Sequence, residues 1–369
     1  MANEVGGAEV LVVTPWYPTE KNAISGMFVL REVDAMTEAG MNVKVIHLDR
    51  GVPDGAIKAA TVHGHRVLRV GFRPSSPLSL VKALRPLRRA LEGADVINSH
   101  AISSLPLVAL AKRKIPWIHT EHWSALSNPK SATPLLRAVR PIFASLLRLP
   151  DAVVAESEML AVPIRRFRGG KPVDLVPCIV PAPKQLIERQ ERPKAIRLAS
   201  TGGVIDRKDP LLSVRTLAAL RDRGVEASLR WTGEGDLREE AQELAAELGV
   251  DAQFLGLGSP DDVEREIADA DVFFAPTKGE NFFVAAAEAL VSGRPLVASQ
   301  LGGHTEYANP AFTEIVTERT PEAYADAVIQ VLDKSEGVPA EEISSSVRER
   351  FSPAKVAQQY KEIYERVTG

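Results

Sequence analysis

Short apolar runs alternate with amphipathic stretches along the whole sequence. The apolar runs are rich in aliphatic and aromatic residues, as in 9–14 and 271–275, and such runs predict buried strands. The longer stretches between them predict helices, and glycines end several of these, as Gly40 does after 26–39 and Gly224 does after 210–223. Strands that alternate with helices in this way predict an α/β protein with parallel sheets.

The same pattern places the elements along the chain. Predicted strands lie at 9–14, 42–48, 66–70, 95–98, 117–120 and 151–155 in the first half, and at 196–200, 227–232, 252–255, 271–275, 295–299 and 314–316 in the second. Further helices are predicted at 237–248, 260–270, 285–290, 321–333 and 353–367. Ser352 provides an N-cap for the last of these, and Pro353 suits its first position.

The length of 369 residues suits two domains rather than one core. Three prolines lie close together at 177, 181 and 183, and a polar stretch follows them up to 193. Such a segment is typical of a domain boundary. We therefore predict a first domain at 1–180, a second at 194–350 and a terminal helix at 351–369. Parallel sheets bind ligands at the carboxyl ends of their strands, so the loops there are the candidate sites.

Charge is divided unevenly between the two halves. Residues 1–180 carry 23 Lys and Arg against 15 Asp and Glu, which gives +8, and residues 181–369 carry 22 against 33, which gives −11. Much of the positive excess lies in 58–114, including Lys82, Arg85, Arg88 and Arg89. Solvated helix faces would explain this excess, and so would an anionic acceptor or a membrane surface. Nucleic acid is not expected, because no nucleic-acid motif accompanies the charge.

Composition excludes several other classes of protein. No apolar run approaches the ~20 residues that span a bilayer, and the N-terminus lacks the features of a secretory signal. The single cysteine, Cys178, permits no internal disulfide and no cysteine-based metal cluster. We therefore expect a cytoplasmic protein, with peripheral contact at the inner membrane face as an option for the basic half. The sequence does not define an oligomeric state.

Two carboxylates eight positions apart mark the most informative segment. Glu280 follows the strand at 271–275, and Glu288 lies about two turns into the predicted helix. The amides of the loop between them point along the positive end of the helix dipole, where phosphate or sugar hydroxyls bind; these residues are Asn281, Phe282, Phe283 and Val284. For an isolated pair of this spacing, ordinary surface charges would be the better interpretation.

Four segments in order give this pair its meaning. The four segments resemble parts of the retaining glycosyltransferases of family 4. Residues 280–295 resemble the E-x7-E segment of that family, and residues 295–306 resemble its Gly-Gly-x-x-Glu turn. Residues 231–235 and 254–257 resemble two of its other loops. The resemblance implies the GT-B architecture, in which two Rossmann-like α/β domains with parallel sheets face each other across an interdomain cleft. It also implies a terminal helix that crosses back onto the first domain.

The resemblance further implies roles for the donor-binding residues. Lys208, Arg207, the turn at Gly26 and the amides after Glu280 would stabilise the departing diphosphate. Glu280 would bind hydroxyls of the donor sugar and Glu288 those of the ribose. The turn at Gly233 would lie near the nucleotide, and the backbone of Leu257 would pair with the base, which suits uracil without excluding guanine. The family's first arginine is missing, because Gly202 and Gly203 stand there, so either Arg207 replaces it or Lys208 acts alone.

The first domain contributes a second group of polar residues. By resemblance His100 occupies the place of a histidine near the transferred sugar, where an imidazole orients a hydroxyl. His122 lies past the end of the next strand, and Glu121 and Trp123 beside it would suit an acceptor, including an amino-sugar or aminocyclitol. A histidine metal site is conceivable, but no carboxylate constellation completes it, and ordinary histidines under a loop would explain the same residues.

These observations predict a retaining glycosyltransferase that moves a sugar from a nucleoside-diphosphate sugar, with UDP as the predicted carrier. The acceptor would be a hydroxyl of a glycan, glycolipid or aminocyclitol in glycoconjugate or antibiotic biosynthesis. No cofactor or metal is expected, since no Asp-x-Asp segment ends a strand. A sugar-nucleotide epimerase of the same fold and a non-catalytic two-lobed binding protein are the alternatives. A dehydrogenase is disfavoured, because the segment 232–238 lacks the third glycine of the dinucleotide motif.

Overall fold

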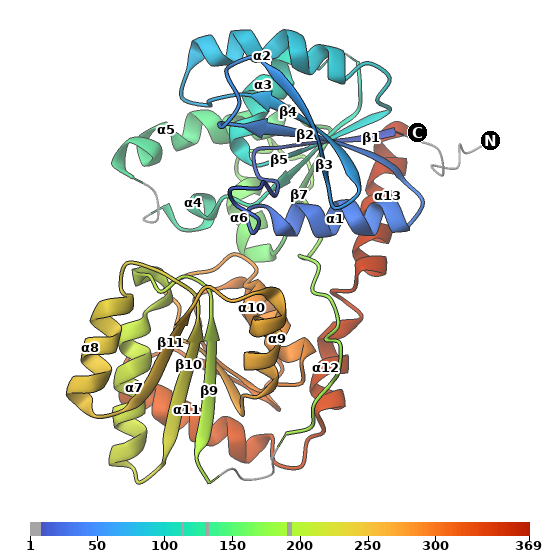
Figure 1. Ribbon diagram of the computed structural model, residues 1–369. Coiled ribbons are helices and arrows are strands. Elements are labelled where there is room, and N and C mark those ends of the chain that lie inside the picture. The colour runs from blue at the N-terminus through green and yellow to red at the C-terminus, as the bar shows by residue number, and fades with distance from the viewer. Residues whose placement is uncertain (1–8, 113, 130–132, 190–193) are drawn as a thin grey trace. The chain divides into compact units, whose positions relative to one another are not determined.

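The computed structural model describes residues 9–112, 114–129, 133–189 and 194–369 (Figure 1). The chain divides into two compact units, Met1–Ile179 with Pro353–Gly369, and Val180–Ser352. We predicted that the second domain starts at 194, whereas the described residues 180–189 also group with the second unit. Each unit is described by itself below.

Unit 1 is built on a sheet whose described strands follow the order β3-β4-β2-β1-β5-β6-β7-β8. The strand bounds are β1 Glu9–Thr14, β2 Asn42–Asp49, β3 Ile57–Val62, β4 His65–Gly71, β5 Val96–His100, β6 Trp117–Glu121, β7 Ala152–Ala155 and β8 Asp174–Leu175. The pairs are parallel except for the hairpin of β3 and β4 at the edge, within the described residues. This hairpin is the one antiparallel departure from the predicted parallel sheet, and β3 itself was not predicted.

Helices cover the sheet of unit 1. Their bounds are α1 Met27–Glu38, α2 Pro77–Ala90, α3 Leu105–Ala111, α4 Ser124–Ser127, α5 Pro134–Ser145, α6 Glu158–Arg165 and α13 Pro353–Thr368. One apolar cluster includes Leu11, Ile97 and Trp117, and the other includes Val12, Ile118 and Tyr360. Because neighbouring residues of a strand point to opposite faces, central strands such as β1, β5 and β6 contribute to both clusters. Helix α13 lies at the end of the chain and packs against α1, which lies near the start of the chain (Figure 1).

Unit 2 holds a sheet of described strands in the order β11-β10-β9-β12-β13-β14, and these strands pair in parallel. The bounds are β9 Ile196–Thr201, β10 Ala227–Thr232, β11 Asp251–Gly256, β12 Val272–Ala275, β13 Leu296–Ser299 and β14 Thr313–Val316. Its helices are α7 Pro210–Asp222, α8 Arg238–Leu248, α9 Pro260–Ala268, α10 Val284–Val291, α11 Pro321–Lys334 and α12 Ala340–Arg348. The predicted strands and helices of this half are all present.

Strand order fixes where each unit can hold a ligand. In unit 2 the chain runs outward from β9 to β10 and β11 on one side, and from β12 to β13 and β14 on the other. In unit 1 the corresponding divergence lies between β1 and β5. At such a switch point the loops after the two strands separate and leave a crevice at their carboxyl ends. The loops after β9, β12, β1 and β5 are therefore the ones that position a site.

Candidate active site

Two loops of unit 2 bring the predicted donor-binding residues together. The loop after β9 forms a short 3-10 helix, Asp206–Lys208, and the loop after β12 carries Glu280 into α10. Lys278 N donates to the Arg207 carbonyl at 2.7 Å, and the Arg207 guanidinium donates to the Gly279 carbonyl at 3.0 Å. These two bonds fasten the loops to each other. Residues about 70 positions apart thereby line one place at the switch point.

A carboxylate with two cations forms the centre of this site. Lys208 Nζ lies 2.7 Å from Glu280 Oε1, and the Arg207 guanidinium forms a second ion pair with the same oxygen. Burial acts to raise the pKa of the Glu280 carboxyl, but the two cations outweigh it and hold the pKa below its usual value. Burial also lowers the pKa of the Lys208 ammonium, and Glu280 offsets part of this effect. An anion at this place would meet two cations that are already positioned.

The entrance of α10 has an unusual backbone conformation. Phe283 has φ 71°, in the left-handed region that a bulky residue rarely adopts, and it directly precedes the helix. Its ring lies 4.2 Å below Lys208 Nζ and packs edge-on against His304. Such a conformation persists only where surrounding contacts hold it, and it often marks a ligand loop. The predicted residues Asn281, Phe282, Phe283 and Val284 form this entrance, and Glu288 lies half-buried one turn into α10.

Residues that the sequence analysis did not single out hold these loops in place. The Arg319 guanidinium donates to the carbonyls of Thr277 at 2.9 Å and Pro276 at 2.8 Å, and it forms an ion pair with Asp209. His304 lies 2.6 Å from the Ser299 carbonyl through Nε2. Arg319 follows β14, so its position after a predicted strand end could have identified it as a candidate from the sequence. Arg319 therefore holds together the loops that follow β9, β12 and β14.

The other predicted donor residues of unit 2 lie on neighbouring loops. Gly233 follows β10 with φ 153°, and a Cβ atom there would lie 2.0 Å from the Gly202 carbonyl oxygen. The glycine thus permits close packing of the β9 and β10 loops, which is a structural reason for its presence. Leu257 follows β11, and 74% of its surface is exposed, so this loop is open to a ligand.

In unit 1 the two predicted histidines form a stacked pair. The rings of His100 and His122 are 5.5 Å apart and within 6° of parallel, and His100 Nδ1 lies 3.2 Å from His122 Nε2. His122 Nδ1 lies 3.2 Å from Glu156 Oε2, which also accepts from the Cys178 thiol at 3.1 Å. On the other side, His100 Nε2 lies 3.9 Å from Glu32 Oε2. The strand ends of β5, β6 and β7 position this row of polar groups.

The pKa values of the two imidazoles are shifted in opposite directions. Burial and the neighbouring His122 hold the pKa of His100 well below its ordinary value. Burial also acts against charge on His122, but the hydrogen bond and charge of Glu156 raise its pKa above the ordinary value. When His122 is protonated, it donates to Glu156 and to His100 Nδ1, and a neutral His100 then has its proton on Nε2.

Two predictions for unit 1 need correction. His100 lies beneath His122 with no exposed side-chain surface, so the structure does not place it for direct contact with a sugar. The Glu121 carboxylate is buried and accepts from the amides of His122 and Trp123 at 2.9 and 2.8 Å, and it pairs with His119 at 3.0 Å. Glu121 therefore shapes the loop that carries His122, and it is not available to bind an acceptor. Trp123 remains partly exposed beside it.

Gly26 opens α1 with φ 72°, and a Cβ atom there would lie 2.4 Å from the Trp16 carbonyl oxygen. The loop after β1 thus folds back on the start of α1, and glycine is required for this approach. The amides of the first turn of α1 remain available at the end of β1, as the resemblance implies for phosphate binding. The expected roles of Gly26 and of the other donor residues remain predictions.

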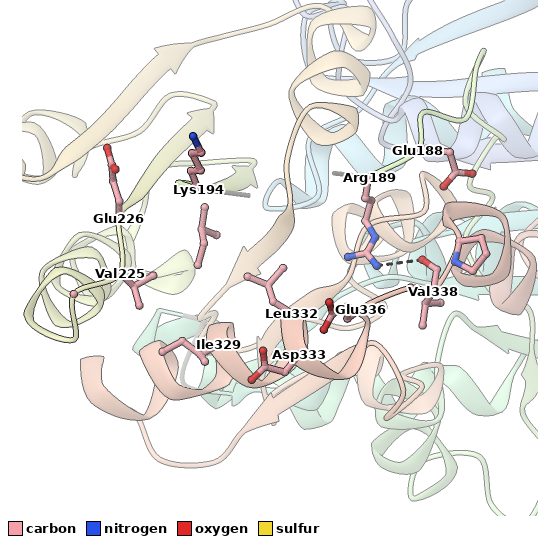
Figure 2. A pocket seen from close by; sticks show the side chains of 14 residues that line it. Glu188, Arg189, Lys194, Val225, Glu226, Ile329, Leu332, Asp333, Glu336 and Val338 are labelled. Carbon is pink, nitrogen blue, oxygen red and sulfur yellow. Dashed lines mark hydrogen bonds between the residues drawn. The ribbon is translucent and has the colours of Figure 1, made fainter. Parts of the chain in front are cut away.

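A separate cavity of about 760 Å3 lies at the opposite edge of the sheet of unit 2, next to the amino end of β9 (Figure 2). Figure 2 shows the Arg189 guanidinium bonded to the Val338 carbonyl at its wall, with Ile329, Leu332 and Asp333 of α11 nearby. Ligands of parallel sheets bind at the carboxyl ends of strands, so this cavity is not the candidate active site. Its lining residues Arg189 and Lys194 flank 190–193, which lie outside the described residues.

Two features are absent from the described residues. Among them no cluster of three or more histidine, cysteine, aspartate or glutamate side chains has the arrangement of a metal site. Within the same residues, none of the helices combines the length and the apolar character that crossing a bilayer requires. The expectation that the activity needs no metal remains a prediction.

Comparison with known proteins identifies the class. A sucrose-phosphate synthase from Thermosynechococcus elongatus superposes with a TM-score of 0.76 over 97% of this chain and 98% of its own, at 19% identity, and the chain has the GT-B fold. Residues 25–182 match the model of Glycosyltransferase Family 4, and residues 195–334 match that of the group 1 glycosyl transferases. The chain belongs to glycosyltransferase family 4.

Curated relatives from two organisms show the same family. A GDP-mannose-dependent alpha-(1-6)-phosphatidylinositol dimannoside mannosyltransferase from Mycobacterium tuberculosis is 36% identical over 145 residues, which are 39% of this chain and 37% of that protein. A D-inositol 3-phosphate glycosyltransferase from Corynebacterium glutamicum is 27% identical over 277 residues, which are 68% of this chain and 66% of that protein. The chain thus matches less than two thirds of the length of either relative.

Proposed function

We propose that this protein transfers a sugar from a nucleoside-diphosphate sugar to a hydroxyl of a sugar-containing acceptor, with retention of anomeric configuration. The observation that carries the proposal is the meeting of Glu280 with Arg207 and Lys208 at the switch point of unit 2. A diphosphate leaving group develops negative charge, and these cations are the groups that stabilise it. The family membership supports the same reaction class.

In the proposed reaction the bond between the anomeric carbon and the phosphate oxygen breaks, and a bond forms from the acceptor oxygen to that carbon. The proton of the acceptor hydroxyl passes to the departing phosphate oxygen, and the nucleoside diphosphate leaves. Lys208 and Arg207 bind this diphosphate, together with the amides at the entrance of α10. Glu280 accepts hydrogen bonds from sugar hydroxyls, and its low pKa keeps it ionised for this task.

His122 takes over the role that we first assigned to His100. It has the more exposed imidazole of the pair, and Glu156 raises its pKa, which favours the cationic form. A cationic imidazole donates hydrogen bonds to sugar hydroxyls. His100 then acts as a positioning residue beneath it. Glu288 on α10 is assigned to the ribose hydroxyls, and the loop at Leu257 to the base.

The base and the acceptor are assigned as candidates for direct testing. The exposed loop at Leu257 accommodates uracil, which we retain as the predicted base. The mannosyltransferase relative is GDP-mannose-dependent by name, so guanine is the second candidate. The names of the relatives refer to a phosphatidylinositol dimannoside and to D-inositol 3-phosphate, and both favour an anionic or lipid-linked acceptor over an aminocyclitol.

Donor and acceptor arrays test this proposal. The purified protein is incubated with UDP- and GDP-sugars, each with inositol phosphates, phosphoinositides and amino-sugars, and the products are identified by mass. Transfer gives a free nucleoside diphosphate together with an acceptor that has gained one sugar. An epimerase would change the sugar nucleotide without an acceptor, and a binding protein would release no nucleotide. Either of these results would overturn the proposal.

A further inference from the structure

Helix α2 of unit 1 presents a basic and apolar face to solvent. Leu78 and Val81 are each 62% exposed. Four cations are exposed on the same helix: Lys82, Arg85, Arg88 and Arg89. Figure 1 shows α2 as an outer helix of the unit, and unit 1 is the half with the positive excess.

The geometry of the helix places these six residues on one side. At 3.6 residues per turn they fall within about 120° around the helix axis. Ser79, Ala83 and Leu87 lie on the opposite side, where they are buried against the core of unit 1. The Ser76 hydroxyl caps the helix by accepting from the Ser79 amide, and Arg88 donates to the Leu110 carbonyl at 3.0 Å. The orientation of the outer face is thus fixed by contacts within the unit.

The surroundings of this face reinforce its charge. From 55 to 91 the sequence contains eight Lys and Arg and no Asp or Glu. A solvated face would normally mix both signs, because interspersed acids relieve the repulsion between neighbouring cations. Here the repulsion between Arg85 and its neighbours on α2 has no compensation from the same segment, and Asp54 just before it acts electrostatically on Lys82. A ligand that supplies many negative charges would remove it.

We propose that the outer face of α2 docks on an anionic lipid bilayer. The cations match the negative surface of such a membrane. Leu78 and Val81 lie between them and insert at the boundary of headgroups and acyl chains, as in helices that lie in a membrane interface. The binding is peripheral, and it stands independently of the proposed sugar transfer.

Other occupants fit this face less well. A soluble acidic polymer would engage the cations but would give Leu78 and Val81 no apolar partner. A second copy of the chain would bring two sets of four cations together, which is repulsive. Helix α5 also exposes large apolar side chains, with Leu135 at 73% and Ile142 at 69%, but it carries fewer cations. It therefore offers a matched apolar control.

Vesicle binding by the full chain tests the proposal. Sedimentation is measured with vesicles of phosphatidylcholine alone and of equal parts phosphatidylcholine and phosphatidylglycerol. We expect at least tenfold stronger partition onto the anionic vesicles, and loss of most of this difference at 1 M salt, where screening shortens the Debye length to about 3 Å. Equal binding to both vesicles, or no binding to either, would overturn the proposal without touching the proposed function.

Paired variants assign the binding to α2. Two double variants of α2 should each reduce partition onto the anionic vesicles at least tenfold. One combines Arg85→Glu with Arg89→Glu, and the other combines Leu78→Ser with Val81→Ser. Leu135→Ser with Ile142→Ser on α5, and Arg215→Glu with Arg221→Glu on α7 of unit 2, should bind like the parent. Thermal unfolding checks that each variant is folded. If the α5 pair abolishes binding while the α2 pairs do not, or if the protein binds polyglutamate and no vesicle, the assignment to α2 is wrong.

Discussion

His100 Nδ1 and His122 Nε2 lie 3.2 Å apart at the ends of neighbouring strands, and the pKa values of the two imidazoles are shifted in opposite directions. Glu156 stabilises the cation on His122, whereas the same cation lowers the pKa of His100. Beyond His100 lies Glu32 of α1, which accepts a hydrogen bond from the Tyr360 hydroxyl at 3.2 Å. The terminal helix α13 therefore reaches the row of polar groups beneath His122, and it links the end of the chain to the strand ends of unit 1.

Glu32 should make the stability of the protein depend on pH. Burial raises the pKa of its carboxyl from 4.5 to about 7. The folded chain then binds more protons than the unfolded chain between these values, so the free energy of unfolding falls as the pH rises from about 5 to about 8. The shift corresponds to about 3 kcal/mol. His122, whose pKa is also raised, adds stability that is lost in the same direction.

Glu32→Gln should therefore flatten the dependence, because the amide does not ionise. Urea unfolding at pH 5 and at pH 8 measures the loss for the parent and for the variant. Glu38→Gln, at an exposed position of the same helix, is the control and should behave like the parent. If Glu32→Gln loses as much stability between the two pH values as the parent does, Glu32 does not carry the effect.

Glu280→Gln should remove most of the transfer while the fold remains. The amide keeps the shape of the side chain but loses the charge that binds donor-sugar hydroxyls, and such charge-assisted bonds contribute about 1.5–3 kcal/mol each. We expect turnover to fall at least tenfold. Glu314→Gln removes a carboxylate that pairs with Lys334 on the exposed side of unit 2, and it should leave turnover unchanged. Activity of Glu280→Gln within twofold of the parent would remove Glu280 from the site.

The pair after β9 allows a direct test of the missing family arginine. Arg207 and Lys208 both pair with Glu280, so we expect both to bind the diphosphate. Arg207→Ala and Lys208→Ala should each weaken nucleoside-diphosphate affinity at least tenfold, about 1.4 kcal/mol. Lys278→Ala is the control, because Lys278 pairs with Asp206 beside them. Calorimetric titration with UDP and GDP gives the affinities. Unchanged affinity for Arg207→Ala with a large loss for Lys208→Ala would show that Lys208 acts alone.

Much of unit 2 could be predicted from the sequence, because its strands are apolar runs and its helices end at glycines. The helices of unit 1 were harder to predict. Helices α2, α5 and α6 each contain an internal proline, which weakens any helix prediction. Edge strand β3 is short and largely exposed, so it lacks the apolar run of a buried strand.

The candidate site also has a part that the sequence predicts and a part that it does not. The loop from Glu280 into α10 could be read from local spacing, and so could the place of Lys208 after a strand. The partners of His122 could not, because Glu32, Glu156 and Tyr360 come from distant parts of the chain and meet only through strand order and helix packing. The left-handed conformation of Phe283 has no local sequence signal at all, since its stability comes from contacts with Lys208 and His304.

The stereochemistry of the product tests the reaction class as a whole. An inverting transferase needs a general base that removes the acceptor proton on the side opposite the leaving group. Glu156 raises the pKa of His122 and so favours its protonated form over a wider pH range, and a protonated imidazole accepts no proton. We therefore expect an α-linked donor sugar to give an α-linked product. Proton NMR of the purified product shows the anomeric coupling directly. A β-linked product would contradict retention, and His122 would then have to act in its neutral form as the base, with activity that rises with pH.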